Sequence, residues 1–165
     1  MPKIEIEETK AYRLINNGCV VLVTSYHKGR PNVMPLAWQM PVSAKPPLVA
    51  VGVAESHFTY ELVRKSGEFV INVPNKSLLS QVVRCGRVSG KEVDKFELTG
   101  LSLARAHSVM TPLVDECIGH LECSVVDVYP TGDHGLFVGE VLSASVEEGL
   151  FEECGVEDER TVTLH

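Results

Sequence analysis

Short runs of apolar and β-branched residues, separated by turn-forming residues, recur along the chain and predict strands. The first run, Val20 to Ser25, is followed by the turn sequence Lys28-Gly29-Arg30-Pro31 and a proline-rich stretch, and the strand pattern resumes at Leu48 to Val53. The backbone amides of a proline-rich stretch cannot all join a strand ladder. Irregular backbone between strands often contacts ligands, so we expect a hairpin that leads into a cofactor loop.

Three later segments continue the strand pattern. Phe69 to Val73 is nearly all apolar, and the long runs Leu113 to Val128 and Leu136 to Val146 are joined by a turn at residues 129–135. The glycine fingerprint of dinucleotide-binding folds and a regular alternation of strands with helices are both absent from the sequence. The pattern therefore favours one all-β domain over residues 1–165, a barrel of antiparallel strands with Greek-key-like connections and short helices.

Three short helices are expected between these strands. Residues 9–17 form an amphipathic segment that we expect to pack across one end of the barrel, and further helices are predicted over His57 to Lys65 and Leu78 to Cys85. Ser77 is expected to cap the last of them. Its apolar stripe is interpreted as packing rather than as a cofactor contact.

The start of the middle helix is a candidate anion site. Ser56 is expected to cap this helix and Thr59 lies in its first turn, so two hydroxyl groups, free backbone amides and the helix dipole meet there. Ordinary capping explains the same residues without a ligand and is the simpler interpretation of the sequence alone. His57 is expected to be a solvated residue whose protonated form a nearby phosphate would favour.

Charge and composition exclude several classes of function. The chain has 22 acidic and 15 basic side chains and a formal net charge of −7, and its basic residues are scattered, so we expect no nucleic-acid partner. No apolar run approaches the length of a membrane span, and acidic residues occupy the place of a signal peptide's apolar region. These features predict a cytoplasmic protein without a membrane partner.

The cysteines suggest neither disulfides nor a metal site. They are odd in number and include no Cys-x-x-Cys pair, so reduced thiols are expected at Cys19, Cys85, Cys117, Cys123 and Cys154. His120 and Cys123 are close in sequence, but the alternation of a strand places them on opposite faces. We therefore expect no metal ion.

Six short motifs occur in an order that resembles the flavin reductase-like family of FMN-binding split barrels, which includes flavoredoxins and ferric reductases. They are Asn-x-Met-Pro at 32–35, Trp-x-x-Pro-Val-Ser at 38–43, Lys-Pro-Pro-Leu at 45–48, Ser-x-x-Thr at 56–59, Gly-Glu-Phe-Val-Ile-Asn at 67–72 and Gly-Asp-His at 132–134. The resemblance covers residues 10–146. It implies a split barrel that binds FMN without a covalent bond.

The resemblance also implies positions for the cofactor. Ser56 and Thr59 would lie near the FMN phosphate, and the polar loop at residues 85–96, a solvated surface loop by composition alone, would form a second wall with Ser89, Gly90 and either Lys91 or Lys95. Residues 36–43 would contact the flavin ring through their backbone. The further cofactor-binding candidates in and around this stretch are Asn32, Leu36, Ala37, Trp38, Pro41, Val42 and Ser43.

Two roles stay open for each of two candidates. Trp38 either covers the flavin ring or fills the adjacent core. Asn72, the polar side chain inside an apolar strand, either bonds a neighbouring loop or holds the flavin or its loop.

His134 is the candidate catalytic residue, because the Gly-Asp-His turn of the family lies by the flavin and is associated with nicotinamide or acceptor contact, and Asp133 can orient its imidazole. The activity implied is NAD(P)H-dependent reduction of flavin, with onward transfer to free flavin, ferric iron or a protein acceptor. A flavoredoxin-like carrier without direct NAD(P)H use and a non-redox binding or assembly module are the alternatives.

The region after Glu147 departs from the family pattern. It is acidic up to Glu159, and residues 160–164 match only the beginning of a strand or tyrosine-bearing tail that the family often carries. The acceptor pocket is therefore expected to be more open or to be completed by a second subunit. A homodimer is the oligomeric state implied by the resemblance.

Overall fold

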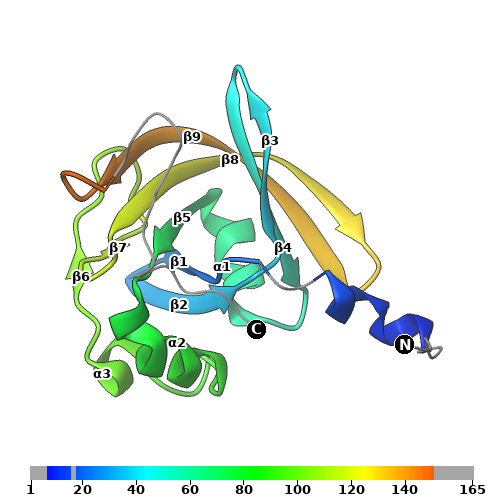
Figure 1. Cartoon of the computed structure of the whole chain (residues 1–165), viewed down its shortest axis with the longest axis horizontal. Coiled ribbons are helices and arrows are strands. Elements are labelled where there is room, and N and C mark those ends of the chain that lie inside the picture. Colours follow the sequence, from blue (N-terminus) through cyan, green and yellow to red (C-terminus); the bar gives the residue numbers. More distant parts are fainter. Residues whose placement is uncertain (1–6, 16–17, 151–165) are drawn as a thin grey trace, which may run out of the picture.

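An antiparallel sheet curves around one short helix and forms most of the molecule (Figure 1). The structure, a computed structural model, describes residues 7–15 and 18–150. The sheet has seven strands in the order β2-β1-β5-β8-β9-β4-β3, and β6 pairs with β7 beside it. The strands are β1 (Val21–His27), β2 (Arg30–Leu36), β3 (Gln39–Ala44), β4 (Pro47–Ala54), β5 (Glu68–Val73), β6 (Leu103–Ala104), β7 (Leu113–Val114), β8 (Gly119–Thr131) and β9 (His134–Val146).

The helices are short and lie on different sides of the sheet. They are the 3-10 helices η1 (Glu8–Leu14) and η2 (Lys76–Leu78) and the α-helices α1 (Phe58–Ser66), α2 (Leu79–Gly86) and α3 (Lys95–Thr99). Helix α1 lies inside the curve of the sheet, whereas α2 and α3 lie outside it against β2 (Figure 1). The predicted all-β antiparallel architecture is confirmed.

Alternation along β1 divides the core into two parts. Val21 and Val23 pack inward with Val63 of α1 and with Phe69 and Phe137, whereas Leu22 faces outward into the cluster formed with α2 and α3. Successive side chains of a strand point to opposite faces, so one apolar run supplies both clusters. The pocket described below opens where these two packed regions meet.

The proline-rich stretch is paired rather than irregular. Residues 30–36 form β2 and residues 39–44 form β3, so only Ala37 and Trp38 remain between two strands. Both β2 and β3 are edge strands of the sheet. Proline is tolerated at an edge because the missing N–H costs no ladder bond on the open side. The expected long cofactor loop is therefore wrong in extent, although the hairpin before it is confirmed.

Two predicted caps are also wrong. His57, not Ser56, is the N-cap of α1, and its side chain makes no capping bond. Asn75, not Ser77, begins the segment that leads into α2, and its side-chain oxygen accepts from the Ser77 backbone N–H at 3.0 Å. Gly67 ends α1 as expected, in a left-handed conformation with φ 72°.

The amino-terminal helix differs from its prediction. It is a 3-10 helix, and its described side chains are exposed, with Ile15 85% exposed just beyond it. The predicted packing across a barrel end depends also on Tyr12, whose side chain lies outside the described part of the structure. Residues 16 and 17 and the carboxy-terminal residues 151–165, which include Cys154 and the expected tail at 160–164, lie outside the described part of the chain.

The described thiols are free. Cys85, Cys117 and Cys123 are buried, Cys19 is exposed, and burial raises the pKa of Cys117 and of Cys123 to about 12. Within residues 7–15 and 18–150 no group of His, Cys, Asp and Glu has the arrangement of a metal site. No helix in this part of the chain is long and apolar enough to cross a membrane.

Candidate functional site

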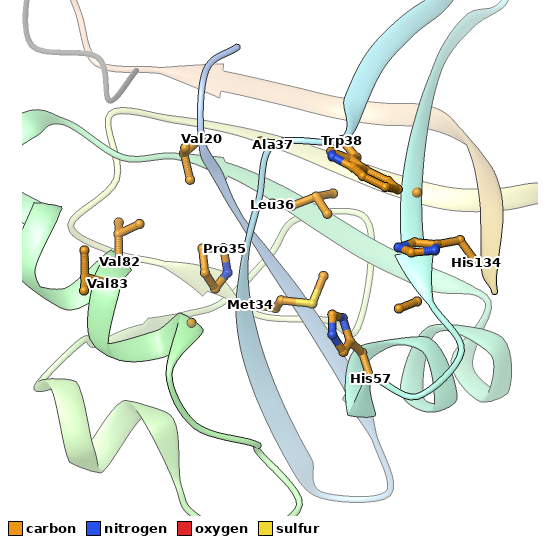
Figure 2. A pocket seen from close by; sticks show the side chains of 13 residues that line it. Val20, Met34, Pro35, Leu36, Ala37, Trp38, His57, Val82, Val83 and His134 are labelled. Atoms are coloured by element: carbon orange, nitrogen blue, oxygen red, sulfur yellow. The ribbon is translucent and has the colours of Figure 1, made fainter. Parts of the chain in front are cut away.

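An apolar cavity of about 370 Å³ opens between the end of β2, the start of α1 and α2 (Figure 2). Most of its wall is aliphatic, and two imidazoles and one indole supply the remaining side-chain surface. The lining residues are Val20, Met34, Pro35, Leu36, Ala37, Trp38, Gly52, Ala54, His57, Val82, Val83, Gly86 and His134. A cavity of this size and character suits a flat apolar ring.

A polar cavity of about 370 Å³ adjoins the first one and shares Met34, Pro35, His57 and Gly86 with it. Its own lining residues are Asn32, Ser56, Phe58, Thr59, Cys85, Arg87, Val88, Ser89, Gly90 and Lys95. Among the described residues, no Asp or Glu lines either cavity, although the whole chain has a net charge of −7. The two cavities together therefore match a ligand with a flat ring at one end and an anion at the other.

Lys95 is the buried cation of the polar cavity. It is the first residue of α3, which Asp94 caps, and only 6% of it is exposed. Its Nζ donates to the backbone oxygen of Cys85 at 2.8 Å, and burial lowers its pKa. Lys91 instead lies outside the cavity, where its Nζ is 3.6 Å from a Glu61 carboxylate oxygen. Of the two lysines that the sequence leaves as alternatives, only Lys95 lines the polar cavity.

Asn32 brings an unsatisfied acceptor to the same cavity. Its Nδ2 donates to the Thr59 hydroxyl at 2.9 Å, and both residues are almost fully buried. Its Oδ1 has no hydrogen-bond partner in the described structure. A buried unpaired acceptor costs about 1–3 kcal/mol.

Gly90 packs directly against the side-chain amide of Asn32. A Cβ at Gly90 would lie 2.0 Å from Asn32 Oδ1 and 3.2 Å from the Phe58 ring. No other residue type fits there without moving the amide.

Substituting this glycine should therefore damage the polar cavity. Gly90→Ala is expected to weaken the FMN binding that the resemblance implies by about tenfold or more, because overpacking of this kind costs about 1–3 kcal/mol. A fluorescence titration of apoprotein with FMN measures the effect. The double variant Asn32→Ala/Gly90→Ala should regain the thermal stability that Gly90→Ala loses, and failure to regain it would show that the clash is not with Asn32.

Trp38 and His134 form one wall of the apolar cavity. Their rings stack with centroids 4.7 Å apart and planes at 27°, and Figure 2 shows them side by side at one end of the cavity. His134 Nδ1 lies 2.6 Å from Asp133 Oδ1, and this hydrogen bond lowers the pKa of Asp133. On the far side of the stacked pair is a third cavity of about 290 Å³, which Trp38 and His134 also line. Trp38 therefore covers a cavity, and the alternative that it fills the core is wrong.

His57 lies where the two cavities join. It lines both of them, and its ring points into the apolar cavity from the start of α1 (Figure 2). Partial burial lowers its pKa, and His134 and Lys95 lower it further by charge repulsion. Sequence reasoning gave this residue no role, because only the fold brings it between the two cavities.

Most predicted cofactor contacts come together in this pair of cavities. The residues that line one or both are Asn32, Leu36, Ala37, Trp38, Ser56, Thr59, Ser89, Gly90, Lys95 and His134. Pro41, Val42 and Ser43 do not line them, because β3 and β4 form a hairpin that projects from the barrel (Figure 1).

Asn72 lies apart from both cavities. Its Nδ2 donates to the backbone oxygen of Leu22 at 2.9 Å, and its Oδ1 accepts from the Val114 N–H at 2.9 Å and lies 3.0 Å from His120 Nδ1. The side chain is fully buried and its groups are satisfied. Of its two proposed roles, the geometry supports the bond to neighbouring backbone.

Sequence reasoning also missed Arg87 and the aliphatic pair Val82 and Val83. The stripe on α2 predicts packing, and Val82 is indeed buried in the core, but both valines also line the apolar cavity. Arg87 follows the end of α2 and lines the polar cavity. In the sequence, only the position of Arg87 next to Gly86 could have indicated that it lies at the site.

Comparisons with known proteins agree with this geometry. The model of the flavin reductase like domain matches residues 13–163. An uncharacterized protein of Archaeoglobus fulgidus is 42% identical over 113 residues, which are 68% of this chain and 64% of that protein. The chain therefore aligns with a little under two thirds of that relative's length.

Two solved structures are similar over nearly the whole chain. Flavoredoxin from Methanosarcina acetivorans has 34% identity and a TM-score of 0.82, with 96% of this chain and 82% of that chain covered. An FMN-binding protein from Thermus thermophilus has 28% identity and a TM-score of 0.80, with 94% and 83% covered. The split-barrel fold is confirmed, and the chain belongs to the flavin reductase like family.

Proposed function

We propose that this protein binds FMN without a covalent bond and transfers electrons through it from NADH or NADPH to free flavin, ferric iron or a protein acceptor. The observation that carries the proposal is the pair of adjoining cavities, one apolar and one polar, with Lys95 and Arg87 and without any carboxylate of the described residues. FMN has the matching shape, with a flat ring, a hydroxylated chain and a phosphate. The FMN-binding name of a structural neighbour supports the same ligand.

The polar cavity would hold the phosphate and the hydroxylated chain. Lys95 supplies a buried positive charge, and the hydroxyls of Thr59 and Ser56 supply donors. Charge-assisted hydrogen bonds are the strong ones at such a site. The residues present therefore fit FMN.

The apolar cavity would hold the ring against Leu36, Ala37 and the Trp38–His134 pair. FMN supplies the redox chemistry when bound, and hydride transfer to a flavin needs no protein nucleophile. The task of the surrounding side chains is to position the ring, exclude water from one side and control charge around it. His134 has an ordered imidazole for this task, because Asp133 fixes its Nδ1 and Trp38 packs on its face.

Binding of FMN and of riboflavin tests the assignment of the two cavities. Since a charge-assisted hydrogen bond is worth about 1.5–3 kcal/mol, the apoprotein should bind FMN about tenfold to a hundredfold more tightly than riboflavin, which lacks the phosphate. Isothermal titration calorimetry measures both affinities. Equal affinities would show that the polar cavity does not hold the phosphate.

His134→Ala should slow reduction of bound flavin by NADH or NADPH by about tenfold while leaving FMN affinity nearly unchanged, because the donor would no longer be positioned by the imidazole. Anaerobic stopped-flow absorbance measures the rate. His134→Phe keeps a ring for the stack on Trp38 and serves as the matched control, which separates stacking from hydrogen bonding. Unchanged reduction in His134→Ala with every donor tested would remove His134 from the reaction.

A flavoredoxin-like carrier is the second candidate, because a flavoredoxin is 34% identical to this chain. Such a protein would retain flavin that neither nicotinamide reduces, and its electrons would come from another protein. A barrel that retains no flavin would instead be a binding or assembly module.

We also propose a homodimer. Met40 and Val42 are exposed on the projecting β3–β4 hairpin, 50% and 44% respectively, directly after Trp38 of the cavity wall. A second copy packed on this hairpin would bury them and close the cavity from outside. Light scattering of the eluted protein should give twice the mass of one chain, and Met40→Asp should lower it to one.

A further inference from the structure

His57 is placed to respond to the charge of any ligand that spans both cavities. It lines each of them at their junction, and no hydrogen bond of its ring occurs within the described structure. It is partly exposed, so a proton can reach it from solvent. A molecule with its ring in one cavity and its phosphate in the other passes this imidazole.

The charged groups that lower the pKa of His57 are basic. His134 faces it from the start of β9 and Lys95 from the start of α3, while Arg87 and Cys85 line the polar cavity beside α2. Met34 and Pro35 of β2 complete the junction without a titratable group. Partial burial and the two nearest basic groups lower the pKa of His57, so in the free protein its neutral form is favoured at neutral pH.

Two of the other basic groups are already engaged. His134 is bonded to the Asp133 carboxylate and stacked on Trp38, and Lys95 donates to the Cys85 backbone oxygen. The ring of His57 has no hydrogen bond in the described structure, and Arg87 stays protonated, so His57 can take up a proton when a negative charge arrives.

We propose that His57 takes up a proton from solvent when the bound flavin is reduced, and that it thereby sets the redox potential of the protein. The inference rests on the proposed binding of FMN. Reduction adds two electrons and one proton to the flavin, so the net charge of the flavin becomes more negative by one. The second proton goes from water to the free ring nitrogen of His57, so the protein–flavin complex takes up two electrons and two protons. No other bond forms or breaks.

The consequence is a pH-dependent potential. The relevant pH range lies above the pKa of His57 in the oxidised complex and below its pKa in the reduced complex. In this range reduction takes up one additional proton, so the redox potential rises more steeply as the pH is lowered. The imidazolium also pairs with the new negative charge, so the potential is higher with His57 than without it.

Spectroelectrochemical titration of the FMN complex between about pH 7 and about pH 9 tests this proposal without a nicotinamide donor. The wild-type protein should take up two protons per two electrons over part of this range, and His57→Gln should take up one throughout. His27→Gln, a substitution on β1 outside both cavities, is the matched control and should behave as the wild type. Equal proton uptake in wild type and His57→Gln would overturn the role of His57.

An independent readout follows the imidazole itself. The NMR-detected pKa of His57 should rise when the FMN complex is reduced with dithionite, and an unchanged pKa would also overturn the proposal. Failure of the protein to retain FMN would be a different result, because it would remove the proposed function and this inference with it.

Discussion

Lys95→Met should reduce FMN affinity by about tenfold to a hundredfold and leave the affinity for riboflavin nearly unchanged. Lys95 is the buried cation of the polar cavity, and methionine keeps most of the aliphatic volume while removing the charge. A charge-assisted hydrogen bond to phosphate is worth about 1.5–3 kcal/mol, which corresponds to this range of affinity. Calorimetric titration of both ligands into both proteins gives the comparison.

Lys91→Met is the matched control for this experiment. Lys91 lies on the same loop but its ammonium faces Glu61 on the surface, so its loss should change FMN affinity by less than about threefold. A larger loss in Lys91→Met than in Lys95→Met would show that the phosphate lies on the other side of the loop. Urea unfolding of Lys95→Met should show stability close to that of the wild type, because a buried ammonium is costly to desolvate.

Asn72→Ala should lower the free energy of unfolding by about 3 kcal/mol while leaving the FMN affinity of the folded protein unchanged. The substitution leaves the Val114 N–H and the Leu22 carbonyl without this side-chain partner in a fully buried place. Each buried group left unsatisfied costs about 1–3 kcal/mol. Urea unfolding of the apoprotein measures the loss.

Asn75→Ala is the reference variant for the loss of stability expected in Asn72→Ala. Asn75 is an exposed cap that accepts from the Ser77 N–H, and its removal should cost about 1 kcal/mol. If Asn72→Ala instead kept its stability and lost FMN affinity, Asn72 would belong to the flavin site and would not have a purely structural role.

Local patterns in the sequence were sufficient to predict most strands. Apolar runs and turn residues located β1, β4, β5 and β9, because short apolar runs bounded by turn residues are typical of buried strands. The predicted strand over Leu113 to Val128 is wrong in extent, because it divides into β7 and β8, and β8 continues to Thr131. The local patterns did not locate β2 and β3, whose prolines argue against a strand unless it lies at an edge. Edge position depends on which strands pair across the sheet, and a local pattern contains no information about that pairing.

The candidate site, like the fold, could be predicted only in part from the sequence. The helix start at Ser56 and Thr59 was recognised from residue types, but its cap is His57, and the side chain of His57 makes no capping bond. The choice between Lys91 and Lys95 depended on where α3 begins, which Asp94 fixes by accepting from two backbone amides. The family resemblance supplied the proposed phosphate site, whereas the position of His57 between the cavities and that of Arg87 in the polar cavity depend on how α2 packs against β2.

The most direct test of the proposed function is a visible absorption spectrum of the purified protein after incubation with FMN and desalting, recorded without oxygen before and after addition of NADH and then NADPH. We expect a flavin spectrum that survives desalting and bleaches with at least one of the two nicotinamides. A colourless protein after incubation with saturating FMN would contradict the proposal.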